Sequence, residues 1–372
     1  MSTVYFTNLR TKPGLNLQQK MIRLVKAAGI EGIDFSHKFT AVKLHFGEPG
    51  NLAFIRHNYV HSLVKFLQEK GAKVFLTDAN TLYSGGRSNA VDHIEAAYEN
   101  GFNPIGVPAP VIIADGLKGT DETSLPVVSG AKTHCQTAKI GSAVANADVL
   151  ISMNHFKGHE QTGFGGAIKN IGMGAASVGG KLDLHSTSAP QIVRKNCTGC
   201  KMCIKYCRYG AISLDFDKIA VIEKSKCVGC GQCIAVCQFD AAQVVWDSSS
   251  ALLFAKIAEY TKAAVEGKPH FHINFMMDIS PMCDCWGNND AAIAPNIGMA
   301  ASFDPVALDQ ACADLVAKSS APAGCLINED GCHPHTGADK FRHVFPKVDW
   351  EAGLEHAQKI GLGSRNYQLN EV

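Results

Sequence analysis

Short apolar runs alternate with amphipathic segments over most of the chain. Strand-like runs occur at 4–7, 39–46, 72–78, one of two runs within 104–115, 147–153 and 270–278. Segments with helical periodicity occur at 16–28, 52–70, 88–100, 134–146, 251–265 and 305–318. This alternation predicts an α/β fold, in which a mostly parallel sheet carries helices on both faces.

A cysteine-rich segment interrupts this alternation. Residues 197–207 read CTGCKMCIKYC and residues 227–237 read CVGCGQCIAVC, so the spacing C-x2-C-x2-C-x3-C occurs twice. The segment resembles bacterial two-cluster ferredoxins, where three thiolates of one motif and the fourth of the other bind one 4Fe–4S cluster. The predicted ligands of cluster one are Cys197, Cys200, Cys203 and Cys237. Those of cluster two are Cys227, Cys230, Cys233 and Cys207.

Two zinc ribbons are the alternative for these cysteines, but zinc ribbons usually combine C-x2-C pairs across a longer arm. The proline that usually follows the fourth cysteine is replaced by Arg208 and Gln238, which bears on cluster potential more than on cluster binding. The alternating runs AISLDF, KIAVIE and AAQVVW predict small sheets beside the clusters. We therefore expect a first α/β part at 1–189, a two-cluster ferredoxin-like domain at 190–247 and a second α/β part at 248–372.

Polar side chains follow the ends of several predicted strands. These side chains are Lys43, His45 and Glu48, then Asp78 and Asn80, then Asn154, His155, Lys157 and His159, and finally Asp278. In open α/β sheets, ligands bind outside the carboxyl ends of the strands. The candidate catalytic residues at this edge are Lys43, His45, His155, Lys157 and His159.

A glycine-rich loop follows the strand at 147–153. Its glycines allow close approach of the backbone to a ligand, and a helix start near Ala167 suits an anion or phosphate. The candidate cofactor-binding residues are Gly163, Gly165, Gly166, Lys169 and Asn170. A loop that merely turns the backbone is the alternative. A phosphate-loop NTPase site is excluded at 174–182, because Ala175 replaces its first glycine and Leu182 its magnesium-binding hydroxyl residue.

Composition narrows the function classes. The 372 residues include 35 Lys and Arg against 34 Asp and Glu, and a net charge of +1 argues against nucleic acid as a partner. No run approaches the roughly 18 apolar residues of a membrane helix, and the first residues lack the apolar core of a secretory signal. We therefore expect a cytoplasmic protein that does not interact with membranes. In such a chain the 14 Cys indicate metal or redox chemistry.

Cysteines outside the two motifs offer a candidate third metal site. Cys283 and Cys285 follow the strand at 270–278 in the sequence SPMCDCWGNND, and thiolates suit zinc or iron. The turn EDGCHPHTG adds Cys332, His333 and His335. Buried thiols without a metal are the more common alternative.

The chain also resembles a known family. The segments at 42–51, 154–174 and 296–315, the paired cysteine motifs and the ending KIGLGSRNYQL are similar to the iron–sulfur family called domain of unknown function 362. This resemblance implies a discontinuous α/β domain with a two-cluster insert, mostly in anaerobes, without implying a reaction. A remoter similarity is to nickel-pincer lactate racemases, in which Lys and His at strand ends hold a nucleotide-derived nickel cofactor. The counterparts by position are Lys43, His45, His155, Lys157, His159 and Lys169.

The favoured function is an iron–sulfur oxidoreductase that passes electrons through two 4Fe–4S clusters to or from a ligand site at the strand ends. Histidines there would move protons, while lysines hold an anionic ligand or an additional metal- or phosphate-bearing cofactor. The partner is a redox protein or a small-molecule substrate. The alternatives are an electron carrier or redox sensor without its own substrate, and a non-redox metal- or cofactor-dependent enzyme with a structural insert.

Overall fold

Eight strands form one central sheet in the part of the chain that the structure describes. This computed structural model describes residues 1–83, 85–186, 189–227, 231–245, 248–329 and 337–372. In spatial order the strands are β16 (Tyr367–Glu371), β1 (Ser2–Asn8), β15 (Gly298–Ser302), β14 (His270–Met276), β7 (Val149–His155), β2 (Phe39–Lys43), β3 (Lys73–Asp78) and β4 (Val111–Ile113). Neighbouring strands are parallel, except that β15 is antiparallel to both β14 and β1. The predicted mostly parallel α/β sheet is confirmed.

The register of the sheet places its apolar residues in two layers. Val42 of β2 is paired with Leu76 of β3 and with Ile151 of β7, so these side chains lie on the same face. Ala41 is paired with Phe75 and Leu150 and therefore faces the other side. β7 is buried at every position, as expected of a parallel strand covered on both faces.

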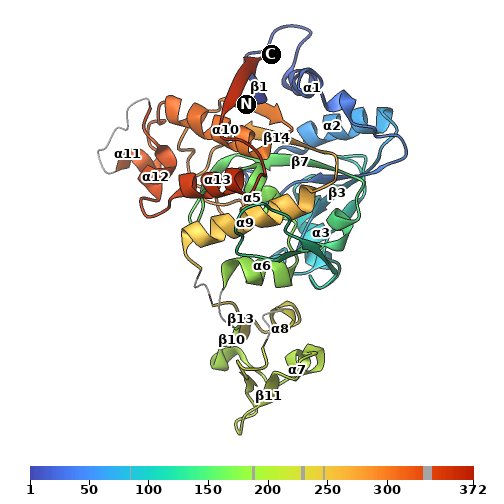
Figure 1. Cartoon of the computed structure of the whole chain (residues 1–372), viewed down its shortest axis with the longest axis vertical. Helices are drawn as coiled ribbons and strands as arrows, with labels where there is room; N and C mark the ends of the chain where they lie inside the picture. The colour runs from blue at the N-terminus through green and yellow to red at the C-terminus, as the bar shows by residue number, and fades with distance from the viewer. Residues whose placement is uncertain (84, 187–188, 228–230, 246–247, 330–336) are drawn as a thin grey trace.

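Helices cover both faces of this sheet (Figure 1). The apolar residues of α1 (Leu17–Ala27), α2 (His57–Glu69) and the end of α3 (Ala90–Glu99) pack with the layer of Val42. The layer of Ala41 packs against α5 (Ala167–Gly172), α9 (Ser250–Val265), α10 (Pro305–Lys318) and α13 (Trp350–Lys359). The remaining α-helices described in the main body are α4 (Ser142–Ala145), α6 (Val178–His185), α11 (Leu326–Glu329) and α12 (Lys340–Val344). Among the described residues, no helix is long and apolar enough to cross a lipid bilayer.

The helix predicted at 134–146 is wrong. Thr137–Gly141 form the strand β6, which pairs with β5 (Glu122–Pro126) as an antiparallel hairpin, and only α4 in this segment is helical. Ala138 and Ile140 alternate into the core, and this period of two over a short stretch outweighs the helical period. The antiparallel hairpin of β8 (Lys157–His159) and β9 (Gly163–Gly165) was likewise not predicted within the glycine-rich loop.

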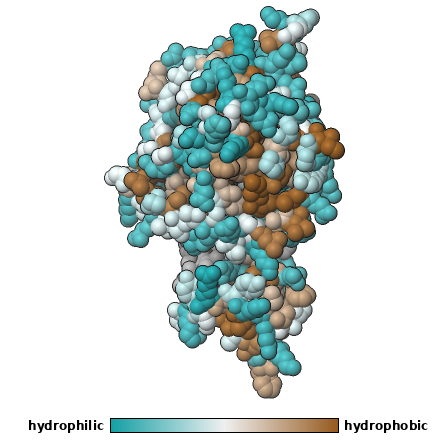
Figure 2. All heavy atoms as spheres, turned by 90° about the vertical axis from the view of Figure 1, so that its right-hand side faces the viewer, coloured by the Kyte–Doolittle hydropathy of each residue, from teal (hydrophilic) through white to brown (hydrophobic). Residues whose placement is uncertain are grey.

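The described residues within 190–245 form a smaller lobe below α6 in Figure 1, and Figure 2 shows this lobe as a narrower part beneath the main body. We call this lobe the insert. Its elements are β10 (Gln191–Ile192), α7 (Met202–Tyr206), β11 (Ile212–Leu214), β12 (Ala220–Ile222), α8 (Gln232–Ala235) and β13 (Ala242–Gln243). β11 pairs with β12 and β10 with β13, so the predicted small sheets are confirmed. The predicted domain boundaries stay predictions.

Candidate functional site

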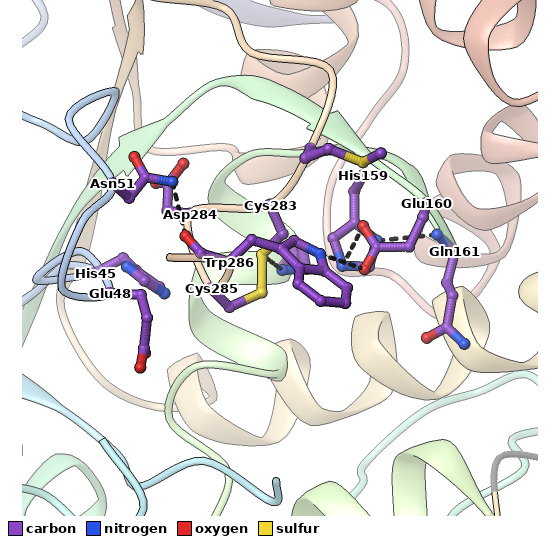
Figure 3. Close-up of a disulfide and its surroundings, with 12 residues drawn as sticks. His45, Glu48, Asn51, His159, Glu160, Gln161, Cys283, Asp284, Cys285 and Trp286 are labelled. Atoms are coloured by element: carbon purple, nitrogen blue, oxygen red, sulfur yellow. Dashed lines mark hydrogen bonds and ion pairs between the residues drawn. A yellow bond between two sulfur atoms is a disulfide. The ribbon is translucent and has the colours of Figure 1, made fainter. Parts of the chain in front are cut away.

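Loops from four neighbouring strands meet at the carboxyl end of the sheet. In the loop after β2, the backbone N–H of Glu48 donates to the carbonyl of Asp284, which follows β14, at 3.1 Å. The Glu48 carboxylate accepts a 2.7 Å bond from Arg87, in the loop after β3. Trp286 Nε1 donates to Glu160, in the loop after β7, at 3.3 Å. The predicted convergence of strand-end loops is therefore present, and Figure 3 shows its centre.

Two lysines lie together in this region. A Cβ added to Gly165 would lie 3.2 Å from Lys157 Nζ and 3.2 Å from Lys169 Cδ, so this glycine lets both side chains pass close to the backbone. Burial lowers the pKa of both amines, and the charge of Lys157 lowers that of Lys169 further. Lys157 is only 4% exposed, and its Nζ donates to no acceptor among the described residues. This amine is therefore available to an anionic ligand, whose charge would favour its protonated form.

Lys43 is held within the protein. Its Nζ lies 2.9 Å from the carboxylate of Asp78 and 2.8 Å from Asn170 Oδ1. Burial lowers the pKa of Lys43, against the opposing charge of Asp78. Asn170 Nδ2 in turn donates to Asn154 Oδ1 at 2.7 Å. Lys43 and Asn170, predicted as catalytic and cofactor-binding residues, thus connect β2, β3, β7 and α5 through buried polar contacts.

His155 is likewise engaged on both ring nitrogens. Nδ1 lies 2.8 Å from the Asp284 carboxylate, and Nε2 lies 2.8 Å from the carbonyl of Met277. Both partners accept hydrogen bonds, so this arrangement fits a ring that donates from both nitrogens. In this arrangement neither nitrogen has a lone pair for a metal, and His155 positions Asp284.

His45 and His159 have a different arrangement. Nδ1 of His45 accepts from the backbone N–H of Gly47 at 2.9 Å, and Nδ1 of His159 accepts from that of Thr162 at 3.1 Å. Burial holds the pKa of both rings well below its usual range, helped by Arg87 at His45 and by the two site lysines at His159. Both rings are therefore neutral near pH 7, with the proton on Nε2.

The helix start at Ala167 is occupied by a side chain of the protein. Asp309 of α10 accepts from the backbone N–H groups of Ala167 at 2.8 Å and Ile168 at 3.0 Å. A Cβ at Gly166 would collide with this carboxylate, so Gly166 permits close approach of Asp309 rather than of a ligand. Burial raises the pKa of Asp309 to about 6. The two N–H groups are therefore not open to the phosphate that the sequence predicted there.

Cys283 and Cys285 form a disulfide with Cα atoms 5.1 Å apart. Cys283 is buried, whereas Cys285 is partly exposed. A bridged pair offers no thiolate, so the predicted third metal site stays a prediction for the reduced protein. Cys332, His333 and His335 lie outside the described residues.

The sequence reasoning missed two residues of the loop after β3. Arg87 is 2% exposed, and its Nη2 donates to the hydroxyl of Tyr83 at 3.1 Å. The Tyr83 hydroxyl donates to the carbonyl of Cys285 at 3.4 Å, and burial raises the pKa of Tyr83 to about 12. The signal that could have found them is their place in the loop after a strand end, the same rule that selected Asn80.

The motif cysteines line two cavities in the insert. Cys197, Cys200, Cys203 and Cys237 line the first, and Cys207, Cys227 and Cys233 line the second. Cys230 lies outside the described residues. Burial raises the pKa of the Cys203 thiol, and the neighbouring Cys200, Cys237 and Cys197 raise it further. The fourth cysteine of each motif thus lies with the first cysteines of the other motif.

The insert and the main body line a further cavity of about 330 Å³, which is open to solvent. Ile234, Ala235 and Cys237 line it from the insert, while Leu82 and Tyr83 line it from the loop after β3. Nearby, Lys118 Nζ of the main body lies 5.1 Å from the ring centre of Tyr206 of α7. Tyr83 therefore borders both this cavity and the disulfide loop.

A separate group of side chains has the donor atoms to hold a metal ion. His134, Glu259 and His356 offer ligand atoms within 4.8 Å of one another. Glu259 is buried and accepts from the backbone of His134 at 2.9 Å, and His356 Nε2 lies 2.7 Å from the same oxygen. No local pattern indicates this group, because its members come from three distant segments of the chain. It is a candidate metal site.

Comparison with known proteins gives a family and distant structural likenesses. Residues 40–314 match the family described as "Domain of unknown function (DUF362)". Similar solved structures include the lactate racemase apoprotein from Thermoanaerobacterium thermosaccharolyticum, with 12% identity, a TM-score of 0.44, and coverage of 86% of this chain and 58% of that one. Another is a Thermotoga maritima protein, with 14% identity, a TM-score of 0.37, and coverage of 80% and 57%. This chain thus spans less than two thirds of either protein. No curated protein matches the sequence.

Proposed function

The chain belongs to the DUF362 family, which matches residues 40–314, and we propose that it is an iron–sulfur oxidoreductase. In this proposal, two 4Fe–4S clusters in the insert pass electrons to or from a ligand site at the strand ends of the α/β body. A redox partner protein would exchange electrons with the clusters, and a small anionic substrate would bind at the strand ends.

The thiol sets of the insert support the cluster part of the proposal. Cluster one would be held by Cys197, Cys200, Cys203 and Cys237, and cluster two by Cys227, Cys230, Cys233 and Cys207. The described members of each set line the same cavity. Backbone N–H groups of Ala211 and Ala241 donate to the sulfurs of Cys207 and Cys237 at 3.3 Å, as is common around cluster ligands. When bound there, such clusters supply single-electron transfer.

The observation that carries the proposal is the cavity between the insert and the main body. Cys237, a predicted cluster ligand, and Tyr83 line this cavity together. Tyr83 also donates to the carbonyl of Cys285. Tyr83 therefore lies between the loop at the ligand site and a cavity that a predicted cluster ligand also lines.

The charged side chains at the strand ends support a ligand site in the α/β body, separate from the clusters. Lys157 and Lys169 would bind an anionic group, and the neutral rings of His45 and His159 would accept or donate protons at Nε2. Glu160 adds an oxygen, Oε2, that has no hydrogen-bond partner among the described residues. An electron carrier without a substrate would not need a buried ammonium without an acceptor, so this alternative is less well supported.

Iron and acid-labile sulfide analysis of anaerobically purified protein tests the cluster part. We expect about eight iron atoms per chain in the wild type and about half of that in Cys237→Ser. The control is Cys312→Ala, which changes a buried thiol of α10 and leaves the iron content unchanged. Zinc in place of iron, or no loss of iron in Cys237→Ser, would contradict the proposal.

A further inference from the structure

The disulfide lies at the centre of the ligand site rather than at its border. Figure 3 shows it between the loop of His45 and Glu48 and the loop of His159 and Glu160. The buried sulfur of Cys283 accepts from Lys169 Nζ at 3.3 Å. The carbonyl of Cys285 accepts from Tyr83, as described above. Each half of the bridge thus contacts a different part of the site.

A bridge of this span contributes little to stability. Disulfides stabilise proteins mainly by restricting the unfolded chain, and the effect grows with the length of the closed loop. Cys283 and Cys285 are separated by a single residue, so the bridge removes little freedom from the unfolded chain. The loop is already fixed by Asp284 on His155 and by Trp286 on Asn51. A structural role therefore does not account for the pair.

The two sulfurs differ in the way that redox-active pairs differ. Cys285 is partly exposed and can meet a reactant, whereas Cys283 is 1% exposed and lies against an amine. A neighbouring cation stabilises a sulfur that leaves as a thiolate, and accessibility selects the sulfur that is attacked.

We propose that Cys283 and Cys285 are a redox-active dithiol–disulfide pair that stores two electrons beside the anion site of Lys157 and Lys169. This inference rests on the proposed function, which supplies the reductant as two equivalents of a one-electron iron–sulfur donor. On reduction the S–S bond breaks, each sulfur gains one electron, and two protons from solvent complete the thiols. The reverse step returns two electrons together to a bound two-electron acceptor.

Thiol mapping on the anaerobic full-length protein tests this inference. The protein is reduced with a photoreduced deazaflavin, and the loss of visible absorbance is used to monitor cluster reduction. Free thiols are then trapped with iodoacetamide and identified by peptide mass spectrometry. We expect alkylation of Cys283 and Cys285 to rise at least tenfold. In a Cys207→Ser/Cys237→Ser variant we expect this rise with dithiothreitol but not with deazaflavin.

The same thiol mapping, carried out on variants of Lys169, tests the role of this side chain. We expect the rate of thiol formation to fall about tenfold in Lys169→Met and to be largely kept in Lys169→Arg, which retains a cation near Cys283.

Three outcomes would overturn the inference. Reduced clusters with an intact bridge would overturn it alone and leave the proposed function standing. A metal ion bound by both thiolates and lost in Cys285→Ser would also overturn it alone. Wild-type protein without iron would overturn it together with the proposed function.

Discussion

His155 Nδ1 and the carboxylate of Asp284 lie 2.8 Å apart, and this contact joins the end of β7 to the loop that carries the disulfide. Both side chains are buried. The charges of His155 and Lys157 hold the pKa of Asp284 below its usual value, although burial alone would raise it. The position of the disulfide therefore depends on a buried polar pair and not only on packing.

Removing this contact should cost stability and loosen the loop. We expect Asp284→Ala to lower the free energy of unfolding by about 3 kcal/mol, because it leaves the buried ring of His155 without its acceptor. Chemical denaturation under anaerobic conditions measures this change. Asp290→Ala is the control, since Asp290 is exposed in the same region of the chain. Equal stability of the two variants would show that the pair does not hold the loop.

The buried pair of Lys43 and Asp78 should make the free energy of unfolding depend on pH in the acidic range. Burial would raise the pKa of Asp78, but the charge of Lys43 and contacts with His93 bring it well below its usual value. A carboxylate with a lowered folded pKa stabilises the protein above its unfolded pKa, and this contribution is lost as the pH falls through the folded value. We expect Asp78→Asn to be destabilised at pH 7 by about 3 kcal/mol and less so below about pH 4. Denaturation at a series of pH values would refute this if the difference were constant.

Gly165→Ala should weaken anion binding without unfolding the protein. The added methyl group would lie 3.2 Å from Lys157 Nζ and 3.2 Å from Lys169 Cδ, so both amines have to move. Thermal unfolding of the wild type with phosphate, sulfate and short dicarboxylates identifies the anion that stabilises it most. We expect this stabilisation to be lost in Gly165→Ala and in Lys157→Ala. Gly130→Ala is the matched control, because a Cβ there meets nothing within 4 Å. If the same anion stabilised both site variants as much as the wild type, the anion would not bind at this site.

The group of His134, Glu259 and His356 should bind zinc. Two imidazoles and a carboxylate are a common zinc donor set. We expect a zinc titration followed by calorimetry to show one binding event that is absent in His356→Ala. His37→Ala, which removes an exposed histidine elsewhere, should keep it. Zinc binding that persists in His356→Ala would place the metal at another site.

Sequence periodicity predicted the sheet because its strands are buried along their length, as β7 is, and separated by amphipathic helices. It failed at 134–146, where the short strand β6 and the four-residue helix α4 follow each other and no single period dominates. The antiparallel strand β15 was also missed, since its sequence GMAAS has no strand-like enrichment and is buried through tertiary packing.

The location of the candidate residues at one edge of the sheet could be predicted from the sequence, but their contacts could not. The rule that ligands bind at strand ends selected Lys157, His159 and His45, and the structure brings these three residues into one region. It could not show that Asp309, more than a hundred positions away, fills the helix start at Ala167. Nor could it show that Lys43 is neutralised by Asp78. Both contacts depend on which distant carboxylate the fold brings close, and local spacing does not contain that information.

Electron paramagnetic resonance of the anaerobically reduced protein tests the central claim most directly. If the insert carries two 4Fe–4S clusters, the spectrum should integrate to about two spins per chain, broadened by interaction between neighbouring clusters, and Cys237→Ser should lower this to about one. A fully metallated protein that shows no such signal, or that contains zinc in its cysteine sites, would contradict the account.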